Sequence, residues 1–256
     1  MRTIAVEEHF TTKEFQDTIT KRLGGPAPVP PHMVEIFKRQ LDLGVSRIHD
    51  MDEAGIDMQV LSLSALGLEA LDAETAIPLV RDCNDVLADA VKSHPDRFAG
   101  FAHLALQDPE SAAAELERCV NRLGLCGAMV SGMTNGKFLD DAVFQPILAT
   151  AEQLGVPIYL HPASPPPAVY EAYFSGLPQG VGSILSMSGW GWHAENALHS
   201  LRLVASGVFD KFPKLQLMIG HMGEGIPFFL ARIEEKLGPI TTYLDRRVPE
   251  SVELSY

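Results

Sequence analysis

Residues 98–132 read FAGFAHLALQDPESAAAELERCVNRLGLCGAMVSG, and this stretch decides the fold. Its two ends, 98–106 and 126–132, are short and apolar, as buried strands are. Between them Asp108 is a good helix N-cap, a proline suits the first helical turn, and Gly124 suits the helix end. A strand, a helix and a second strand in this order predict two parallel strands that are joined by a helical crossover.

The same alternation runs through the chain and predicts an α/β fold with parallel strands. A helix that stops before His94-Pro95 follows the second expected strand, and a helix with an internal proline follows the fourth. We expect strands within 3–10, 55–64, 98–106, 126–132, 156–162 and 214–225, and helices within 71–94, 108–124, 140–155, 194–213 and 226–238. The helix within 194–213 should end near Gly207.

Both an open doubly wound sheet and a (β/α) barrel fit this alternation, and the strand ends favour the barrel. Four histidines lie at or just past the carboxyl end of an expected strand, where the strands of a TIM barrel converge on one site. A dinucleotide-binding fold would require a glycine-rich phosphate loop after the first strand, and the sequence has none there. We therefore expect a TIM-type (β/α)8 barrel, with these histidines at its mouth: His9, His103, His161 and His221.

The sequence contains too few expected strands for a complete barrel. Six strands are expected, whereas a closed barrel of this type needs eight. A seventh should begin near 246–256, the last residues of the sequence. We therefore expect a single metal-dependent hydrolase-like barrel domain over 1–256, truncated after strand six, with the C-terminal strands seven and eight missing.

Composition and charge exclude several classes of partner. The 256-residue chain carries a formal net charge of −13, so it repels the phosphates of nucleic acids. It has no basic block for an anionic membrane surface and no apolar run long enough to span a bilayer. The first strand follows the N-terminus without a secretory leader, and the cysteines are few and odd in number. These features predict a cytoplasmic protein without nucleic-acid or membrane partners.

Glutamate and histidine side chains at three strand ends predict a metal site. Residues two apart in a strand face the same side, so Glu7 and His9 can offer an oxygen and a nitrogen to one ion. The fifth strand ends in His161, and the sixth is followed by His221 and Glu224. Histidines together with a carboxylate suit Zn²⁺, Mn²⁺ or Fe²⁺.

Two other polar residues, His103 and Glu8, fit this metal site less well. A histidine at a strand end is more often structural than functional, and the sequence stays apolar past His103. Glu8 faces the opposite side of the first strand from its neighbours, so we expect it to bond a helix or a loop.

Several blocks of the sequence also resemble a known family, in the same order along nearly the whole chain. The most specific blocks are HPDRF (94–98), LHP (160–162) and GHMGEG (220–225), together with VEEHF (6–10) near the start. They resemble the amidohydrolase-related (amidohydrolase 2) metal-dependent decarboxylases, the group that includes γ-resorcylate (2,6-dihydroxybenzoate) decarboxylase. The resemblance implies a TIM barrel with one divalent metal ion, Zn or Mn, and a metal-dependent carboxy-lyase. Its substrate would be a small aromatic carboxylic acid with an ortho hydroxyl.

The resemblance also implies roles for individual residues and a homodimer or homotetramer. Ser131 stands where the family has an asparagine near the substrate, which puts the preferred ring substituents in doubt. The family's last ligand and proton donor, an aspartate at the end of strand eight, has no match in this chain. The metal ligands would be Glu7, His9 and His161; the catalytic pair His221 and Glu224; and the substrate-binding residues Trp192, Arg232 and Ser131.

Two other functions remain open at this point. The same scaffold could use a metal-activated water to hydrolyse a lactone, an amide or an enol ester. With the eighth strand absent, the chain could instead be a degenerate, non-catalytic protein that is kept for binding or assembly.

Overall fold

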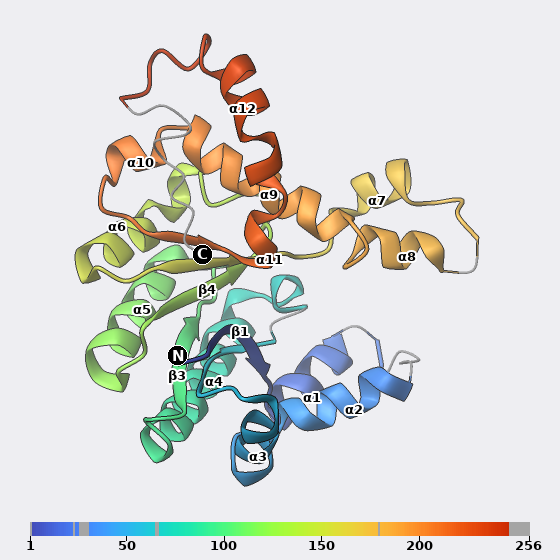
Figure 1. Cartoon of the computed structure of the whole chain (residues 1–256), viewed down its shortest axis with the longest axis vertical. Coiled ribbons are helices and arrows are strands. Elements are labelled where there is room, and N and C mark those ends of the chain that lie inside the picture. Colours follow the sequence, from blue (N-terminus) through green and yellow to red (C-terminus); the bar gives the residue numbers. More distant parts are fainter. Residues whose placement is uncertain (1, 23, 26–30, 65–66, 179, 246–256) are drawn as a thin grey trace. The chain divides into compact units, whose positions relative to one another are not determined.

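The computed structural model describes residues 2–22, 24–25, 31–64, 67–178 and 180–245 (Figure 1). Its strands pair in chain order, β1-β2-β3-β4-β5-β6. A doubly wound sheet would instead reverse direction at a switch point, so sequential order is what a barrel requires. The predicted α/β class and the six predicted strands are confirmed: β1 (Ile4–Phe10), β2 (Met58–Leu63), β3 (Phe98–His103), β4 (Gly127–Ser131), β5 (Ile158–His161) and β6 (Leu217–Ile219).

The chain divides into two compact units, residues 1–129 and 130–256, and each is described by itself. In the first unit β1 pairs with β2, β2 with β3, and β3 with β4, all in parallel. The register between β1 and β2 shifts between Ala5 and Glu8. The helices of this unit are α1 (Lys13–Arg22), α2 (Pro31–Gln40), α3 (Val45–Ala54), α4 (Ala73–Ser93) and α5 (Pro109–Leu123), with a 3-10 turn, η1 (Leu68–Ala70).

The predicted carboxyl end of α4 and both predicted ends of α5 are confirmed. The Asp72 carboxylate accepts the Thr75 backbone N–H at the start of α4, and the helix ends before His94-Pro95. The Asp108 carboxylate accepts the backbone N–H of Ser111, and Gly124 ends α5 with a φ of 74°. Aspartate supplies the acceptor that the first helical turn lacks, and glycine adopts a left-handed conformation without strain.

In the second unit β5 pairs with β6 in parallel, with Ile158 opposite Leu217 and Leu160 opposite Ile219. The helices are α6 (Gln145–Leu154), α7 (Pro167–Tyr173), α8 (Val181–Ser186), α9 (Gly191–Ala205), α10 (Val208–Lys211), the short turn α11 (Gly220–Gly223) and α12 (Ile226–Leu237), and a 3-10 turn, η2 (Ala142–Phe144), precedes α6.

Two predicted helices of this unit have different bounds. The helix expected at 140–155 begins only at Gln145, so its proline lies in the first turn, where no N–H is needed. The helix expected within 194–213 begins earlier than predicted, at Gly191. Its end at Ala205 agrees with the predicted end near Gly207, which adopts a left-handed conformation before α10. The seventh strand expected near 246–256 lies outside the described residues.

The apolar core of each unit lies where helices cover the strands. In the first unit Leu61 and Phe98 on the strands and Leu87 on α4 are almost completely buried, and in the second Ile147 on α6 and Leu160 on β5 are. Among the described helices, none is both long and apolar enough to cross a membrane.

Candidate functional site

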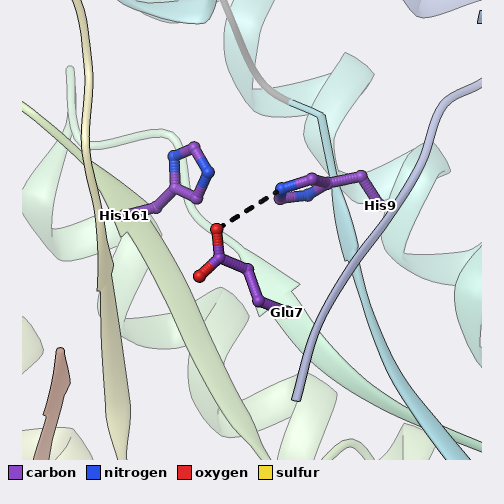
Figure 2. A group of neighbouring side chains, drawn as sticks. All are labelled: Glu7, His9 and His161. Atoms are coloured by element: carbon purple, nitrogen blue, oxygen red, sulfur yellow. Dashed lines mark ion pairs between the residues drawn. The ribbon is translucent and has the colours of Figure 1, made fainter. Parts of the chain in front are cut away.

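The carboxyl end of β1 brings Glu7 and His9 together, as strand alternation predicts. The Glu7 Oε1 atom lies 4.0 Å from His9 Nε2, and both side chains are partly exposed (Figure 2). A divalent ion binds carboxylate oxygen and imidazole nitrogen at about 2.0–2.2 Å, so both atoms are within reach of one ion. Figure 2 also draws His161, which belongs to the second unit and is described with it.

A serine on β2 orients the ring of His9. The Ser62 hydroxyl donates to the Glu8 carbonyl at 3.3 Å and lies 3.1 Å from His9 Nδ1. A hydroxyl has only one proton to donate, so Ser62 accepts the hydrogen bond from Nδ1–H of His9. The ring is therefore the tautomer with its lone pair on Nε2, the nitrogen that faces Glu7. Metal-binding histidines are commonly oriented by such a hydrogen bond.

An arginine of α3 anchors the same strand end. Arg47 is half-buried, and its guanidinium donates to the His9 carbonyl at 2.7 Å and to Gln59 Oε1 at 3.1 Å. Glu8 lies on this side of β1. Burial raises the pKa of the Glu8 carboxyl, with the Glu7 charge acting in the same direction and the nearby Arg47 cation opposing both. Glu8 thus faces α3, in agreement with its expected structural position.

His161 ends β5 in the second unit, and a backbone carbonyl orients its ring. Its Nδ1 atom lies 2.7 Å from the oxygen of Pro162. A carbonyl can only accept, so Nδ1 carries the proton and the lone pair of the neutral ring is on Nε2. His161 and His9 therefore share the same tautomer, and both fit a site for a divalent ion.

The turn after β6 has an unusual backbone. His221, Met222 and Glu224 have φ angles of 46°, 58° and 52°, and the glycines at 223 and 225 are also left-handed. Each such non-glycine residue costs about 1–2 kcal/mol. Strain of this size persists only where surrounding contacts hold it, and it is most common at functional sites.

A buried carboxylate holds this turn together. The Glu224 side chain is completely buried and accepts three N–H groups. His221 Nδ1 lies 2.9 Å from Oε1, and Asn196 Nδ2 also lies 2.9 Å from Oε1. His193 Nδ1 lies 2.6 Å from Oε2. The structure thus places Glu224 in contact with His221, as the resemblance implies.

His193 and Asn196 are not among the residues that the sequence pointed to. Their signal would have been two polar side chains three residues apart on one face of a helix, in the segment GWHAEN. One ligand atom from each of His193, His221 and Glu224 lies within 4.8 Å of the others, a spacing that could also hold a metal ion. The distances of 2.6 and 2.9 Å from the two histidines to Glu224 are those of hydrogen bonds, so these groups contact one another directly.

The second unit also contains aromatic ring contacts around His221. Its ring centroid lies 5.1 Å from that of His193 and 6.1 Å from that of His161, both edge to face. The half-buried Trp192 lies in the first turn of α9, and its indole N–H is buried with no hydrogen-bond partner among the described residues.

The other predicted residues are spread over further elements. Ser131 is half-buried at the end of β4. Arg232 lies on the exposed side of α12, where it forms an ion pair with Glu235 at 3.2 Å, and it borders an apolar groove of about 440 Å³ between α9 and α12. His103 is buried, and Asn84 bonds both its backbone N–H and its carbonyl, so it lies in the core as expected.

Comparison with known proteins identifies relatives along nearly the whole chain. Residues 20–237 match the model of a family described as amidohydrolase. A γ-resorcylate decarboxylase from Polaromonas sp. (strain JS666) is 41% identical over 247 residues, which are 93% of this chain and 72% of that protein.

Two solved structures are also similar. A dihydroxybenzoic acid decarboxylase from Polaromonas sp. JS666, with bound manganese and the inhibitor 2-nitroresorcinol, is 39% identical with a TM-score of 0.83, over 96% of this chain and 75% of that one. A 5-carboxyvanillate decarboxylase from Sphingomonas paucimobilis is 34% identical with a TM-score of 0.85, over 96% and 76%. These relatives are decarboxylases of hydroxylated aromatic acids.

Proposed function

Because this chain belongs to the amidohydrolase family, we propose that it is a metal-dependent, non-oxidative decarboxylase of a hydroxybenzoate-type aromatic acid. The observation that carries the proposal is the similarity to γ-resorcylate decarboxylase along nearly the whole chain. The substrate carries a hydroxyl ortho to its carboxylate, as 2,6-dihydroxybenzoate does. The inhibitor 2-nitroresorcinol of the relative supports this pattern, since its nitro group stands between two hydroxyls.

We place one divalent ion on Glu7, His9 and His161. Glu7 and His9 lie towards the carboxyl end of β1 and His161 ends β5, and in a barrel this end of the strands carries the site. Both histidines have the Nε2 lone pair that a ligand needs. The manganese of the relative favours Mn²⁺, with Zn²⁺ as the alternative. A bound ion would supply positive charge to hold the carboxylate and the ortho-hydroxyl oxygen of the substrate.

His221 is the acid/base of this chain. Its Nδ1 atom is directed at Glu224, so a proton that it exchanges with the substrate passes through Nε2. Because Nδ1–H is held by Glu224, Nε2 first takes up a proton from solvent. This N–H bond then breaks as the proton passes to the ring carbon that carries the carboxylate, and a C–H bond forms there. The bond from this carbon to the carboxylate then breaks, its electron pair returns to the ring, and carbon dioxide leaves. Aromaticity, lost on protonation, is thereby restored.

Three further residues are proposed to bind the substrate. Trp192 would pack against the ring, and its indole N–H, which has no hydrogen-bond partner among the described residues, could bond a substituent. Arg232 would bind a negative group once it leaves Glu235. Ser131, shorter than an asparagine, would leave more room beside the ring.

The test compares two isomers. The purified chain, supplemented with Mn²⁺, is incubated with 2,6-dihydroxybenzoate and with 3,5-dihydroxybenzoate, which has the same groups but no ortho hydroxyl. We expect carbon dioxide and resorcinol from the first isomer, no product from the second, and loss of activity with a chelator. A parallel panel of lactones is assayed for acid release. Acid from the lactones, with no carbon dioxide from any hydroxybenzoate, would overturn the proposal.

A further inference from the structure

We propose that His193 is a positioning residue for His221 and that it acts through the carboxylate of Glu224. The inference rests on the proposed function in one respect, that His221 is the group beside the substrate. The geometry that carries it lies within the second unit, on α9 and the turn after β6.

The two oxygens of Glu224 are divided between two sets of donors. Oε1 accepts from His221 and from Asn196, whereas Oε2 accepts from His193 at 2.6 Å. The plane of the carboxylate is therefore fixed from both ends. Without the donor on Oε2, the buried carboxylate could rotate about its last bond, and the direction in which Oε1 faces His221 would no longer be set.

His193 is itself held in place. Its second ring nitrogen, Nε2, lies 3.3 Å from the Ser188 carbonyl, and its ring meets the His221 ring edge to face. The ring therefore cannot turn without losing contacts on two sides. A fixed ring is what a residue needs in order to orient another group.

The backbone of the turn makes this orientation necessary. His221 and Glu224 both have positive φ angles, so their side chains do not take the directions that a regular helix or strand would give them. The Glu224 carboxylate links the strained turn to α9. Because it holds Nδ1 of His221, it keeps Nε2 as the nitrogen that serves the substrate.

Asn196 provides a second attachment that does not depend on His193. Its amide donates to Glu224 and also to the carbonyl of Leu160 on β5, at 3.0 Å. A change at His193 therefore leaves Glu224 with two donors and the turn attached to the sheet. We expect such variants to fold and to keep the structure of the turn, while the ring of His221 loses its fixed orientation.

Three substitutions separate the two nitrogens of His193. The amide of asparagine can take the place of Nδ1, which faces Glu224, whereas the amide of glutamine takes the place of Nε2, which faces Ser188. His193→Leu removes both nitrogens. The matched control is His49→Leu, at an exposed histidine that forms an ion pair with Glu53.

We expect His193→Leu and His193→Gln to lower kcat by about 10–100-fold, with KM and metal content unchanged, because outer hydrogen bonds around a site have effects of this size. His193→Asn should retain activity to within about threefold, as a donor on Oε2 is kept. Equal kcat values for the asparagine and glutamine variants would overturn the proposal, and this comparison remains available if the leucine variant does not fold.

Two readouts do not depend on the proposed reaction. The ¹⁵N NMR signals of His221 should show one tautomer, protonated on Nδ1, in the wild type and a mixture in His193→Leu. This result would support the positioning role even if no hydroxybenzoate were decarboxylated, in which case only the proposed function fails. A metal titration that shows two equivalents in the wild type and one in His193→Leu would instead make His193 a ligand and overturn the inference.

Discussion

The end of β1 and the turn after β6 contain the same two residue types, but they position them in opposite ways. Glu7 and His9 lie on a strand, where ordinary alternation turns both side chains to one face. His221 and Glu224 lie in a left-handed turn that the backbone disfavours. The first pair needs only orientation of one ring, by Ser62, whereas the second needs a buried carboxylate with three donors.

This difference shows how strain and hydrogen bonding compensate for each other. A relaxed strand end keeps its geometry when a neighbouring side chain changes. A strained turn depends on its polar contacts, because loss of one removes part of what holds the unfavourable φ angles. Substitutions at the two regions should therefore fail in different ways.

The largest effect is expected from exchanging the two histidines for alanine. His9→Ala should lose both bound metal and activity, by more than the roughly 100-fold that an outer hydrogen bond contributes. His221→Ala should lose activity to a similar extent but retain the metal. Metal analysis and steady-state kinetics on both variants check this, with His49→Ala as a control.

Retention of metal by His9→Ala would show that the end of β1 is not the metal site. Loss of metal from both variants would remove the distinction between the two regions.

The next effect concerns the stability of the folded protein in acid. It depends on a histidine of α9, the helix that holds the left-handed turn. His199 on this helix accepts the backbone N–H of Leu139 at 2.9 Å, so its ring must be neutral. Burial lowers the pKa of His199 from 6.5 to about 4; the Asp140 charge opposes this and the Arg202 charge adds to it. The unfolded chain then binds the proton more readily than the folded one, and stability falls as the pH drops from about 6.5 towards 4.

Over this range we expect a loss of about 3 kcal/mol in the free energy of unfolding, measured by denaturant titration at each pH. In His199→Gln an amide oxygen can accept the same N–H without titrating, so the pH dependence should become flatter. An equally steep dependence in that variant would assign the acid sensitivity to other groups.

A smaller effect is expected from the orienting serine of β2. Ser62→Ala removes the hydrogen bond that fixes the tautomer of His9, and we expect metal affinity to fall by about 10–100-fold. The fold should be unaffected. Ser64→Ala, just past the same strand, is the matched control for equilibrium metal titration, and equal affinities of the two variants would contradict the role of Ser62.

The smallest effect tests strain in the turn directly. Met222 has a φ of 58° and a side chain that is almost completely exposed, so its replacement removes little packing. Met222→Gly should raise the free energy of unfolding by about 0.5–1 kcal/mol, since glycine adopts this conformation without strain. Met222→Ala keeps the strain and should show no gain. A gain that is equal in both variants would indicate that strain is not what the glycine relieves.

Local chemistry accounts for the parts of the fold that the sequence predicted. Asp108 and Gly124 mark the ends of α5 because capping depends on one or two side chains. The start of α9 at Gly191 was missed, since the residue before it caps the helix with no side-chain hydrogen bond. In the site, Glu7 with His9 could be paired from alternation alone, whereas His193 and Glu224 lie far apart in sequence and nothing local joins them.

The sequence by itself determined the α/β order, the strands, and the histidines and carboxylates at their ends, because strand period and helix caps are short-range properties. The tertiary structure decided which nitrogen of each histidine carries the proton and which donors converge on Glu224. Those features depend on hydrogen bonds between residues distant in the chain, such as Ser62 with His9 and Asn196 with Glu224. Such contacts exist only once the strands and helices have packed, and no local pattern of the sequence specifies them.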